Sequence, residues 1–301
     1  MDGTMKMIQR SRFYYTRYNN TGPIKMNRVY SKYSQECAEK FAHAHPDVTL
    51  PPSPLQTTAA FSIKNVFPAD RAMELSQFIT TKIEENDPRF AKDDLQVRIA
   101  TPLKTLGTVI LDVLKNPEID RALLNFFRGY YRVESIAASR TLPTNRVTGS
   151  WLWHCDTFPP CTCKLFLHLT PANADRGATE FMDRKDTMAF RDAGYFGQYP
   201  NERVGNLDEF AAAHNIPYRP FHLDAEPGDV TMFNQNYFHR AIAPKTSFRD
   251  TVQLFFLPNP VPWKEQYDKD PDFLNNNMVS FPKDPAIPGS SSGGAAGMMG
   301  A

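Results

Sequence analysis

The chain has 301 residues, 34 basic and 33 acidic side chains, and a formal net charge of +1 at pH 7. This length suits one large β domain with helical additions, and the balanced charge, without a basic stripe, argues against a dedicated nucleic-acid-binding protein. No apolar run is as long as a membrane span and no secretory segment follows Met1, so we expect a cytoplasmic protein that does not enter membranes.

Residues 1–57 form a basic, tyrosine-rich segment with few acids. A basic, acid-poor start is found in organelle-targeting sequences, but the tyrosines and the lack of an amphipathic stripe argue against that use. We expect an arm that packs on the following domain or on a second copy of the chain, so a homo-oligomer is one alternative. Contact of this aromatic and basic arm with nucleic acid is the less favoured alternative.

Helices are expected at the start of a domain that spans residues 58–287. Apolar residues recur near helical spacing in Asp70–Glu84, and Leu103–Leu114 and Ile119–Phe127 are two further expected helices. Helices of this kind usually pack outside a β domain and stiffen it. The tail, residues 288–301, is rich in glycine and serine and is flexible by composition.

The four cysteines are few for a chain of this length, and they indicate a reducing compartment. Cys161 and Cys163 are separated by one residue, which is not a zinc-binding spacing without further ligands. We therefore interpret the thiols as packing residues.

His-x-Asp, a spacing that places two metal ligands close together, occurs three times: at His45–Asp47, His154–Asp156 and His222–Asp224. With seven histidines and a typical Asp content, chance gives roughly 0.4 matches, so the tripeptide alone is weak evidence. The first match lies in a proline-rich irregular stretch, and the third lies just before the turn Pro227–Asp229. The sequence context therefore favours the second.

Ser150–Asp156 is rich in aromatic residues and predicts a strand. Since side chains alternate across a strand, His154 and Asp156 would lie on the same face, as a shared metal ion requires. The plain alternative is a hydrogen-bonded His–Asp pair at a strand end.

A second motif lies downstream, where Asn236–Ala243 carries His239 and Thr251–Leu257 has the composition of a strand. Arg249 and Thr251 are two residues apart and share a face of that strand. A guanidinium binds a carboxylate through two charge-assisted hydrogen bonds, and the hydroxyl adds a third donor. We expect these segments to pair as antiparallel neighbours, which brings His239 and the Arg–Thr pair into one pocket. The alternative for Arg249 is a surface salt bridge.

Two histidines and one carboxylate with open coordination positions are typical of a non-heme Fe(II) oxygenase. Together, His154, Asp156 and His239 supply that set, and we predict that they are the metal ligands and the catalytic centre.

The stretch from Ser150 to Pro260 resembles the phytanoyl-CoA dioxygenase-like branch of the Fe(II)/2-oxoglutarate-dependent oxygenases. The resemblance depends on five pieces in order: Trp153–Asp156, Cys163–Thr170, Gly177–Phe181, Pro227–Phe233, and His239 with Arg249. It implies a mainly β fold with flanking helices, a double-stranded β-helix of the jelly-roll or cupin-like kind. It also implies Fe(II), 2-oxoglutarate and O2. The sequence departs from the family pattern at Met182–Asp186, which leaves the path of the next loop open.

The resemblance implies roles for the cofactor-binding residues. Arg249, helped by Thr251, would bind the distal carboxylate of 2-oxoglutarate. Lys164, Phe166 and His168 share one strand face, and Lys164 or His168 would contact cofactor or substrate if that face is the inner one. Alternation alone does not say which face is inside.

These residues predict a dioxygenase that hydroxylates a small molecule and releases succinate and CO2. A hydroxylase is favoured over a related halogenase because Asp156 is present, whereas halogenases of this kind carry a small residue there. The alternatives are a metal-binding cupin-like barrel without turnover, and a hydrolase or isomerase on the same fold. The insertion Arg191–Tyr218, with Trp151 or Trp153, is expected to help form the substrate pocket; a surface insertion without catalytic contact is the alternative.

Overall fold

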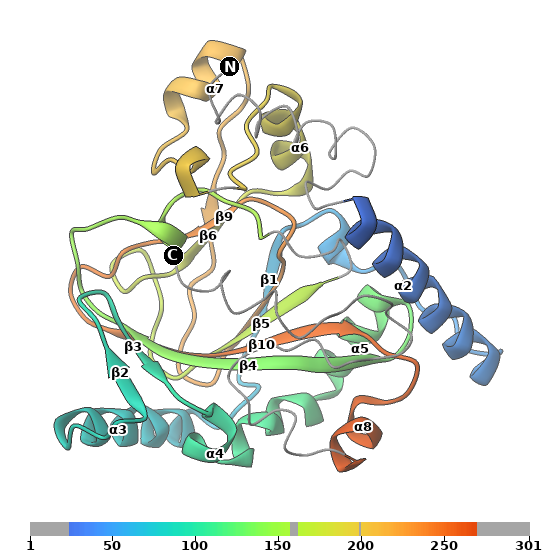
Figure 1. Ribbon diagram of the computed structural model, residues 1–301, viewed down its shortest axis with the longest axis horizontal. Coiled ribbons are helices and arrows are strands. Elements are labelled where there is room, and N and C mark those ends of the chain that lie inside the picture. Colours follow the sequence, from blue (N-terminus) through green and yellow to red (C-terminus); the bar gives the residue numbers. More distant parts are fainter. Residues whose placement is uncertain (1–23, 157–161, 199, 270–301) are drawn as a thin grey trace.

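The computed structural model describes residues 24–156, 162–198 and 200–269. Two antiparallel sheets form its centre, one of seven strands and one of three (Figure 1). The larger sheet has the order β1 (Ala60–Ile63), β8 (Val230–Asn234), β5 (Cys163–His168), β10 (Arg249–Pro258), β4 (Tyr131–Thr141), β3 (Gln96–Ile99), β2 (Phe90–Lys92). The smaller sheet has the order β7 (Phe221–His222), β6 (Thr179–Phe181), β9 (His239–Ala241).

The helices lie outside the sheets (Figure 1). They are α2 (Ile24–Ala44), α3 (Ala69–Glu84), α4 (Pro102–Leu106), α5 (Pro117–Phe127), α6 (Arg184–Asp192), α7 (Asp208–His214) and α8 (Trp263–Lys269). Short 3-10 helices span Pro54–Gln56, Thr108–Lys115, Gly149–Trp151 and Pro200–Glu202. None of the helices in the described ranges is long and apolar enough to cross a membrane.

The two faces of the larger sheet differ in chemistry. On β10, Val252, Leu254 and Phe256 alternate with Arg249 and Thr251, as expected for a strand. The three apolar side chains join the main core, to which α3, α4 and α5 also contribute buried side chains. The opposite face therefore turns toward the smaller sheet, and it carries the polar and aromatic residues.

The sheets contact each other through aromatic rings. Phe181 of β6 lies 5.3 Å from Phe233 of β8, and Phe233 lies 5.2 Å from His239 of β9, between ring centroids. Two antiparallel sheets packed in this way, with helices outside, confirm the predicted fold class, the mainly β double-stranded β-helix. In the described chain the sheets remain separate and do not close into one barrel.

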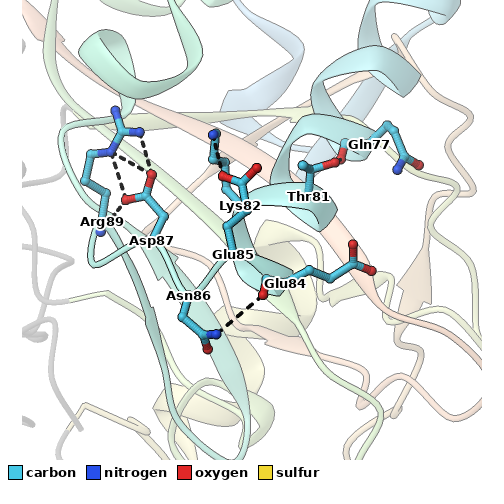
Figure 2. A network of polar contacts seen from close by, with 8 residues as sticks. All are labelled: Gln77, Thr81, Lys82, Glu84, Glu85, Asn86, Asp87 and Arg89. Carbon is cyan, nitrogen blue, oxygen red and sulfur yellow. Dashed lines mark hydrogen bonds and ion pairs between the residues drawn. The ribbon is translucent and has the colours of Figure 1, made fainter.

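Helix α3 confirms the helix predicted from Asp70 to Glu84. The chain leaves it through a tight turn in which Asn86 has a left-handed φ of 56°. Polar contacts hold this turn in place (Figure 2): Lys82 pairs with Glu85 at 2.6 Å, and Arg89 pairs with Asp87 at 2.6 Å. The hydrogen bonds from Arg89 lower the pKa of Asp87 to about 2. The turn leads the chain into β2 at the edge of the larger sheet.

Two helical predictions need correction. The predicted helix Leu103–Leu114 is interrupted at Gly107, whose φ of 88° ends α4 before the 3-10 helix begins. Within residues 1–57, α2 was not predicted, although Tyr30, Tyr33, Cys37 and Phe41 form one buried stripe along it.

Helix α2 packs on the domain beside β10. Phe41 lies 4.9 Å from Tyr130 between ring centroids, and the Arg132 guanidinium lies 6.0 Å from the Tyr33 ring. The predicted basic segment before residue 24 and the predicted flexible tail, residues 288–301, lie outside the described residues. So does Cys161, while Cys37, Cys155 and Cys163 are buried.

Candidate metal centre

A single β-bridge joins the two histidines of the predicted metal site. His154 N donates to His239 O at 3.1 Å, and His239 N donates to His154 O at 2.9 Å. One ligand atom from each of His154, Asp156 and His239 lies within 4.8 Å of the others. The carboxylate is 3.8 Å from the Nε2 atom of both imidazoles. Three ligands from two segments therefore converge on one point, as a facial triad requires.

The local structure around the triad differs from the expectation in two respects. The predicted strand Ser150–Asp156 is a 3-10 turn at Gly149–Trp151 followed by an extended segment with only the one bridge. The strand that carries His239, β9, pairs with β6 and not with the Arg249 strand. The predicted antiparallel pairing of those two segments is therefore wrong, because they lie in opposite sheets.

The imidazole rings are oriented by backbone carbonyls. Nδ1 of His154 lies 2.7 Å from Leu152 O, and Nδ1 of His239 lies 2.9 Å from Tyr237 O. Since a carbonyl only accepts, we assign the ring proton to Nδ1 in each case. Both Nε2 lone pairs are then free for a metal, and the carbonyls hold the rings in place.

Burial and charge keep the three groups in the forms that bind metal. Burial lowers the pKa of His154 to about 3, helped by the neighbouring His239, and burial likewise lowers the pKa of His239. Burial alone would raise the pKa of Asp156, but the Lys164 ammonium and the two imidazoles outweigh it and hold that pKa below its usual range. At neutral pH the site thus offers two neutral imidazoles and one carboxylate.

Lys164 lies on the inner face of β5, with its Nζ 2.6 Å from Oδ2 of Asp156. The ammonium is 4.6 Å from the centroid of Phe255 and 5.8 Å from that of Phe233. The residue predicted to bind cofactor is thus at the metal centre, where it neutralises the carboxylate ligand.

A second polar group lies farther along the same face. Thr251 of β10 is the register partner of His168 on β5, and Arg249 begins β10. All three are buried, and Arg249 Nε, Thr251 Oγ1 and His168 Nδ1 have no hydrogen-bond partner. Arg249 Nη1 donates to Gly177 O, and His168 Nε2 lies 3.0 Å from Thr231 Oγ1. These three unsatisfied polar atoms belong to neighbouring strand positions, and the cluster of Arg249, Thr251 and His168 suits an anionic ligand.

The electrostatics of this cluster agree with its hydrogen bonding. Burial lowers the pKa of Arg249 to about 10, so the guanidinium remains charged at neutral pH. Burial also lowers the pKa of His168 to about 3, and the charge of Arg249 adds to that effect. Of these three side chains, Arg249 alone is therefore positively charged at neutral pH.

The other two His-x-Asp pairs lie outside this centre. His222 lies on β7 and is partly exposed, and its Nε2 is 3.3 Å from the carboxylate of Asp224. His45 follows α2, and its Nε2 lies 2.5 Å from the Tyr130 hydroxyl. Within the described residues, the triad is the one group of three or more acidic, histidine or cysteine side chains arranged for a metal ion.

The insertion Arg191–Tyr218 holds the His154 segment from outside. The buried indole of Trp153 donates to the Tyr218 hydroxyl at 2.8 Å, and the Tyr195 hydroxyl donates to Trp153 O at 2.7 Å. Trp153 thus binds the insertion through both its side chain and its backbone. Trp151 is also buried, and its indole nitrogen has no hydrogen-bond partner.

One residue near the centre was not predicted from the sequence. Arg203 lies on the insertion, and its positive charge lowers the pKa of both His154 and His239, although less than burial does. The sequence around Arg203 has no strand pattern or motif, so no local signal points to it.

No family model and no curated protein matches the sequence. Among solved structures, the chain resembles SnoK, described as a non-heme alpha ketoglutarate dependent carbocyclase from nogalamycin biosynthesis: 16% identity, TM-score 0.49, 74% of this chain and 91% of that one. AviO1 from Streptomyces viridochromogenes has 16% identity and a TM-score of 0.46 over 71% and 98% of the two chains. EctD from S. alaskensis, crystallised with 2-oxoglutarate and 5-hydroxyectoine, has 13% identity and a TM-score of 0.45 over 68% and 78%. At such identities and scores the likeness decides neither the chemistry nor the substrate of this chain.

Proposed function

We propose that this protein is an Fe(II)- and 2-oxoglutarate-dependent oxygenase that hydroxylates a small molecule. The observation that carries the proposal is the presence of two complementary sites at the two ends of one face of β5, where Lys164 contacts Asp156 and His168 is the register partner of Thr251. One is the triad His154, Asp156 and His239, and the other is the unsatisfied pair Arg249 and Thr251. The phytanoyl-CoA dioxygenase-like branch and a cytoplasmic location belong to the same proposal.

The residues fit both the metal and the co-substrate. Two neutral imidazoles and one carboxylate suit Fe(II), and a buried guanidinium beside a free hydroxyl suits the distal carboxylate of 2-oxoglutarate. Lys164 and His168 are four residues apart on β5, which separates their Cα atoms by about 13 Å. A five-carbon dicarboxylate, together with the reach of the side chains, spans that interval.

Iron held by the triad would supply the oxygen chemistry, in which 2-oxoglutarate and O2 yield succinate, CO2 and a hydroxylated product. The chain's own residues position and shield the reactants. Arg249 and Thr251 fix the distal carboxylate, Lys164 offsets the charge of Asp156, and Phe233 packs against His239 to exclude water from one side.

A metal-binding barrel without turnover, or a hydrolase or isomerase, is the alternative. Neither needs a buried guanidinium without an acid beside it. Leaving such a donor unsatisfied costs about 1–3 kcal/mol or more, which a carboxylate ligand removes. Arg249 therefore favours the 2-oxoglutarate-dependent enzyme.

The test is the decarboxylation of 2-oxoglutarate with O2 consumption by protein loaded with Fe(II). We expect turnover in the wild type, and no iron binding at micromolar metal in His239→Ala by isothermal titration. Asp156→Ala should lose hydroxylation, because the iron loses its one anionic protein ligand.

His222→Ala is the matched control, since His222 also belongs to a His-x-Asp pair but lies outside the centre. It should bind iron like the wild type. Iron binding that survives His239→Ala and fails in His222→Ala would show that His222, and not His239, binds the metal.

A further inference from the structure

Arg203 is held beside the metal centre by the backbone around it. The carbonyl of the next residue, Val204, accepts a hydrogen bond from Trp153 N at 2.8 Å, directly before His154. Arg203 Nη2 donates to Gln198 O at 3.3 Å. The residue after Arg203 is thus bound to the segment that carries the first candidate metal ligand, and the Arg203 side chain is held by the insertion itself.

Gly197, next to Gln198, lies against the same segment. A Cβ atom placed on Gly197 would come within 2.7 Å of Trp153 O and 3.1 Å of His154 Cα. The insertion therefore approaches the metal ligand as closely as backbone allows, and Arg203 lies between two such points of contact.

The guanidinium of Arg203 has capacity left for hydrogen bonds. Its Nε is buried and has no partner, and in the described ranges no carboxylate lies within ion-pair distance of it. Two other arginines near the insertion are satisfied: Arg240 pairs with Glu180 at 2.6 Å, and Arg219 pairs with Asp186 at 2.5 Å. Arg203 as a residue is half-buried, and leaving its buried Nε without an acceptor is costly unless a ligand supplies one.

The guanidinium of Arg203 lies close to the segment that carries the first candidate metal ligand. It donates to Gln198 O at 3.3 Å, and the neighbouring Gly197 approaches the backbone of His154. These two contacts place the guanidinium beside the His154 segment.

We propose that Arg203 binds an oxyanion group of the substrate, a carboxylate or a phosphate, and so selects anionic small molecules for oxidation. This inference rests on the proposed function, since it gives the substrate class of that site. Two cations from different elements would then serve two anions: Arg249 of β10 binds 2-oxoglutarate, and Arg203 of the insertion binds the substrate.

The test uses phenylglyoxal, which modifies arginine, on the full chain saturated with Fe(II) and 2-oxoglutarate without oxygen. Acetate, methyl phosphate and acetamide are the probes, and peptide mass spectrometry gives the modification rate at Arg203 and at the exposed Arg146. Acetate or methyl phosphate should slow modification at Arg203 severalfold, and acetamide should not. Which anion protects distinguishes carboxylate from phosphate. Equal rates with all three probes, or equal protection of Arg146, would overturn the proposal.

Variants provide a second measurement, the thermal unfolding midpoint of the same saturated protein. At about ten times its dissociation constant, the protecting anion should raise Tm by roughly 3–6 °C. Arg203→Gln should lose this rise, Arg203→Lys should keep part of it, and Arg146→Gln should keep all of it. A rise retained in Arg203→Gln contradicts the proposal.

The two proposals fail in different ways. Absence of 2-oxoglutarate turnover and binding counts against the proposed function, whatever the anions do at Arg203. If Arg203→Gln instead weakens 2-oxoglutarate binding as much as Arg249→Ala does, Arg203 serves the co-substrate, and the inference about the substrate is wrong.

Discussion

Arg249 is buried at the start of β10, and no carboxylate of the described chain lies within ion-pair distance of it. It remains charged, because its pKa, lowered by burial to about 10, is still above neutral pH. The neighbouring Thr251 hydroxyl is equally unsatisfied. A folded protein tolerates such groups where a ligand completes them.

The proposed binding of the 2-oxoglutarate carboxylate by Arg249 and Thr251 predicts an order of effects. Each charge-assisted hydrogen bond contributes roughly 1.5–3 kcal/mol, so loss of a bidentate pair in Arg249→Ala should raise the Michaelis constant for 2-oxoglutarate by about two to four orders of magnitude. Arg249→Lys should raise the Michaelis constant less, since an ammonium keeps the charge but lacks the two parallel N–H donors of the guanidinium. Thr251→Ala should weaken the binding of 2-oxoglutarate by about 1 kcal/mol, the value of one neutral hydrogen bond.

Iron binding by isothermal titration is the control, and it should change little in all three variants because neither residue is a ligand. A larger effect of Thr251→Ala than of Arg249→Ala would show that another cation, Lys164 first, binds the co-substrate.

The buried histidines predict how stability depends on pH. The pKa of His154 and of His168 is lowered to about 3, and that of His239 is also lowered, mainly by burial. Below pH 6.5 the unfolded chain binds protons that the folded chain does not. The free energy of unfolding of the metal-free protein should therefore fall as the pH falls, by up to about 1.4 kcal/mol per unit for each histidine.

Urea unfolding between pH 7.5 and 5 measures this slope. His168→Gln should make this dependence on pH less steep by the contribution of one histidine, up to about 1.4 kcal/mol per pH unit. A slope that is the same in this variant as in the wild type would show that His168 is not kept neutral by the fold.

At the scale of elements, the insertion Arg191–Tyr218 and the His154 segment behave as one unit. Trp153 hydrogen-bonds to the insertion through its backbone N–H, its carbonyl and its indole. The Arg240 guanidinium lies 4.9 Å from the Trp153 ring and also donates to Gly205 O. We therefore expect a displacement of the insertion to displace His154 as well.

Two glycines of the insertion test this coupling as a matched pair. Gly197 and Gly194 both have positive φ, 54° and 102°, but only Gly197 faces the Trp153–His154 backbone; nothing lies within 4 Å of a Cβ on Gly194. Gly197→Ala should displace His154 and weaken iron binding by an order of magnitude or more. Gly194→Ala should cost only backbone strain, about 1–3 kcal/mol of stability.

Isothermal titration of iron and urea unfolding, carried out on both variants, separate the two effects. If both variants lose stability alike and bind iron alike, the close approach at Gly197 has no influence on the metal site.

At the scale of the whole molecule, β10 joins the site to the scaffold. Between Arg249 and Thr251, Asp250 points to the other face, where it binds Arg140 at 2.7 Å and the Ser76 hydroxyl of α3 at 2.6 Å. The Arg140 guanidinium also lies 3.6 Å from the Phe248 ring centroid. A buried ion pair thus fixes the strand that carries Arg249 and Thr251 against α3.

Removal of one partner should be strongly destabilising. Asp250→Ala leaves Arg140 buried without its counterion and should lower the free energy of unfolding by about 3–5 kcal/mol. The double replacement Arg140→Met with Asp250→Leu should recover most of that loss. Urea unfolding checks both, and a double variant no more stable than Asp250→Ala would mean that packing, rather than the unpaired charge, dominates.

Much of the site could be predicted from local spacing. Residues two apart on an extended segment share a face, which relates His154 to Asp156 and Arg249 to Thr251. The periodicity of α3 and α5 likewise depends only on neighbours along the chain. Helix α2 could have been found in the same way, from its stripe of buried aromatic residues.

The sequence alone determined which kinds of side chain meet: two imidazoles, a carboxylate and an isolated arginine. Only the tertiary structure decided which strands pair, that β9 belongs to the smaller sheet, and that Lys164 reaches Asp156. It also brought the segment around Arg203 against the segment that carries His154. The physical reason is that spacing along a strand is set by the backbone, whereas pairing between distant segments is set by packing that no local pattern encodes.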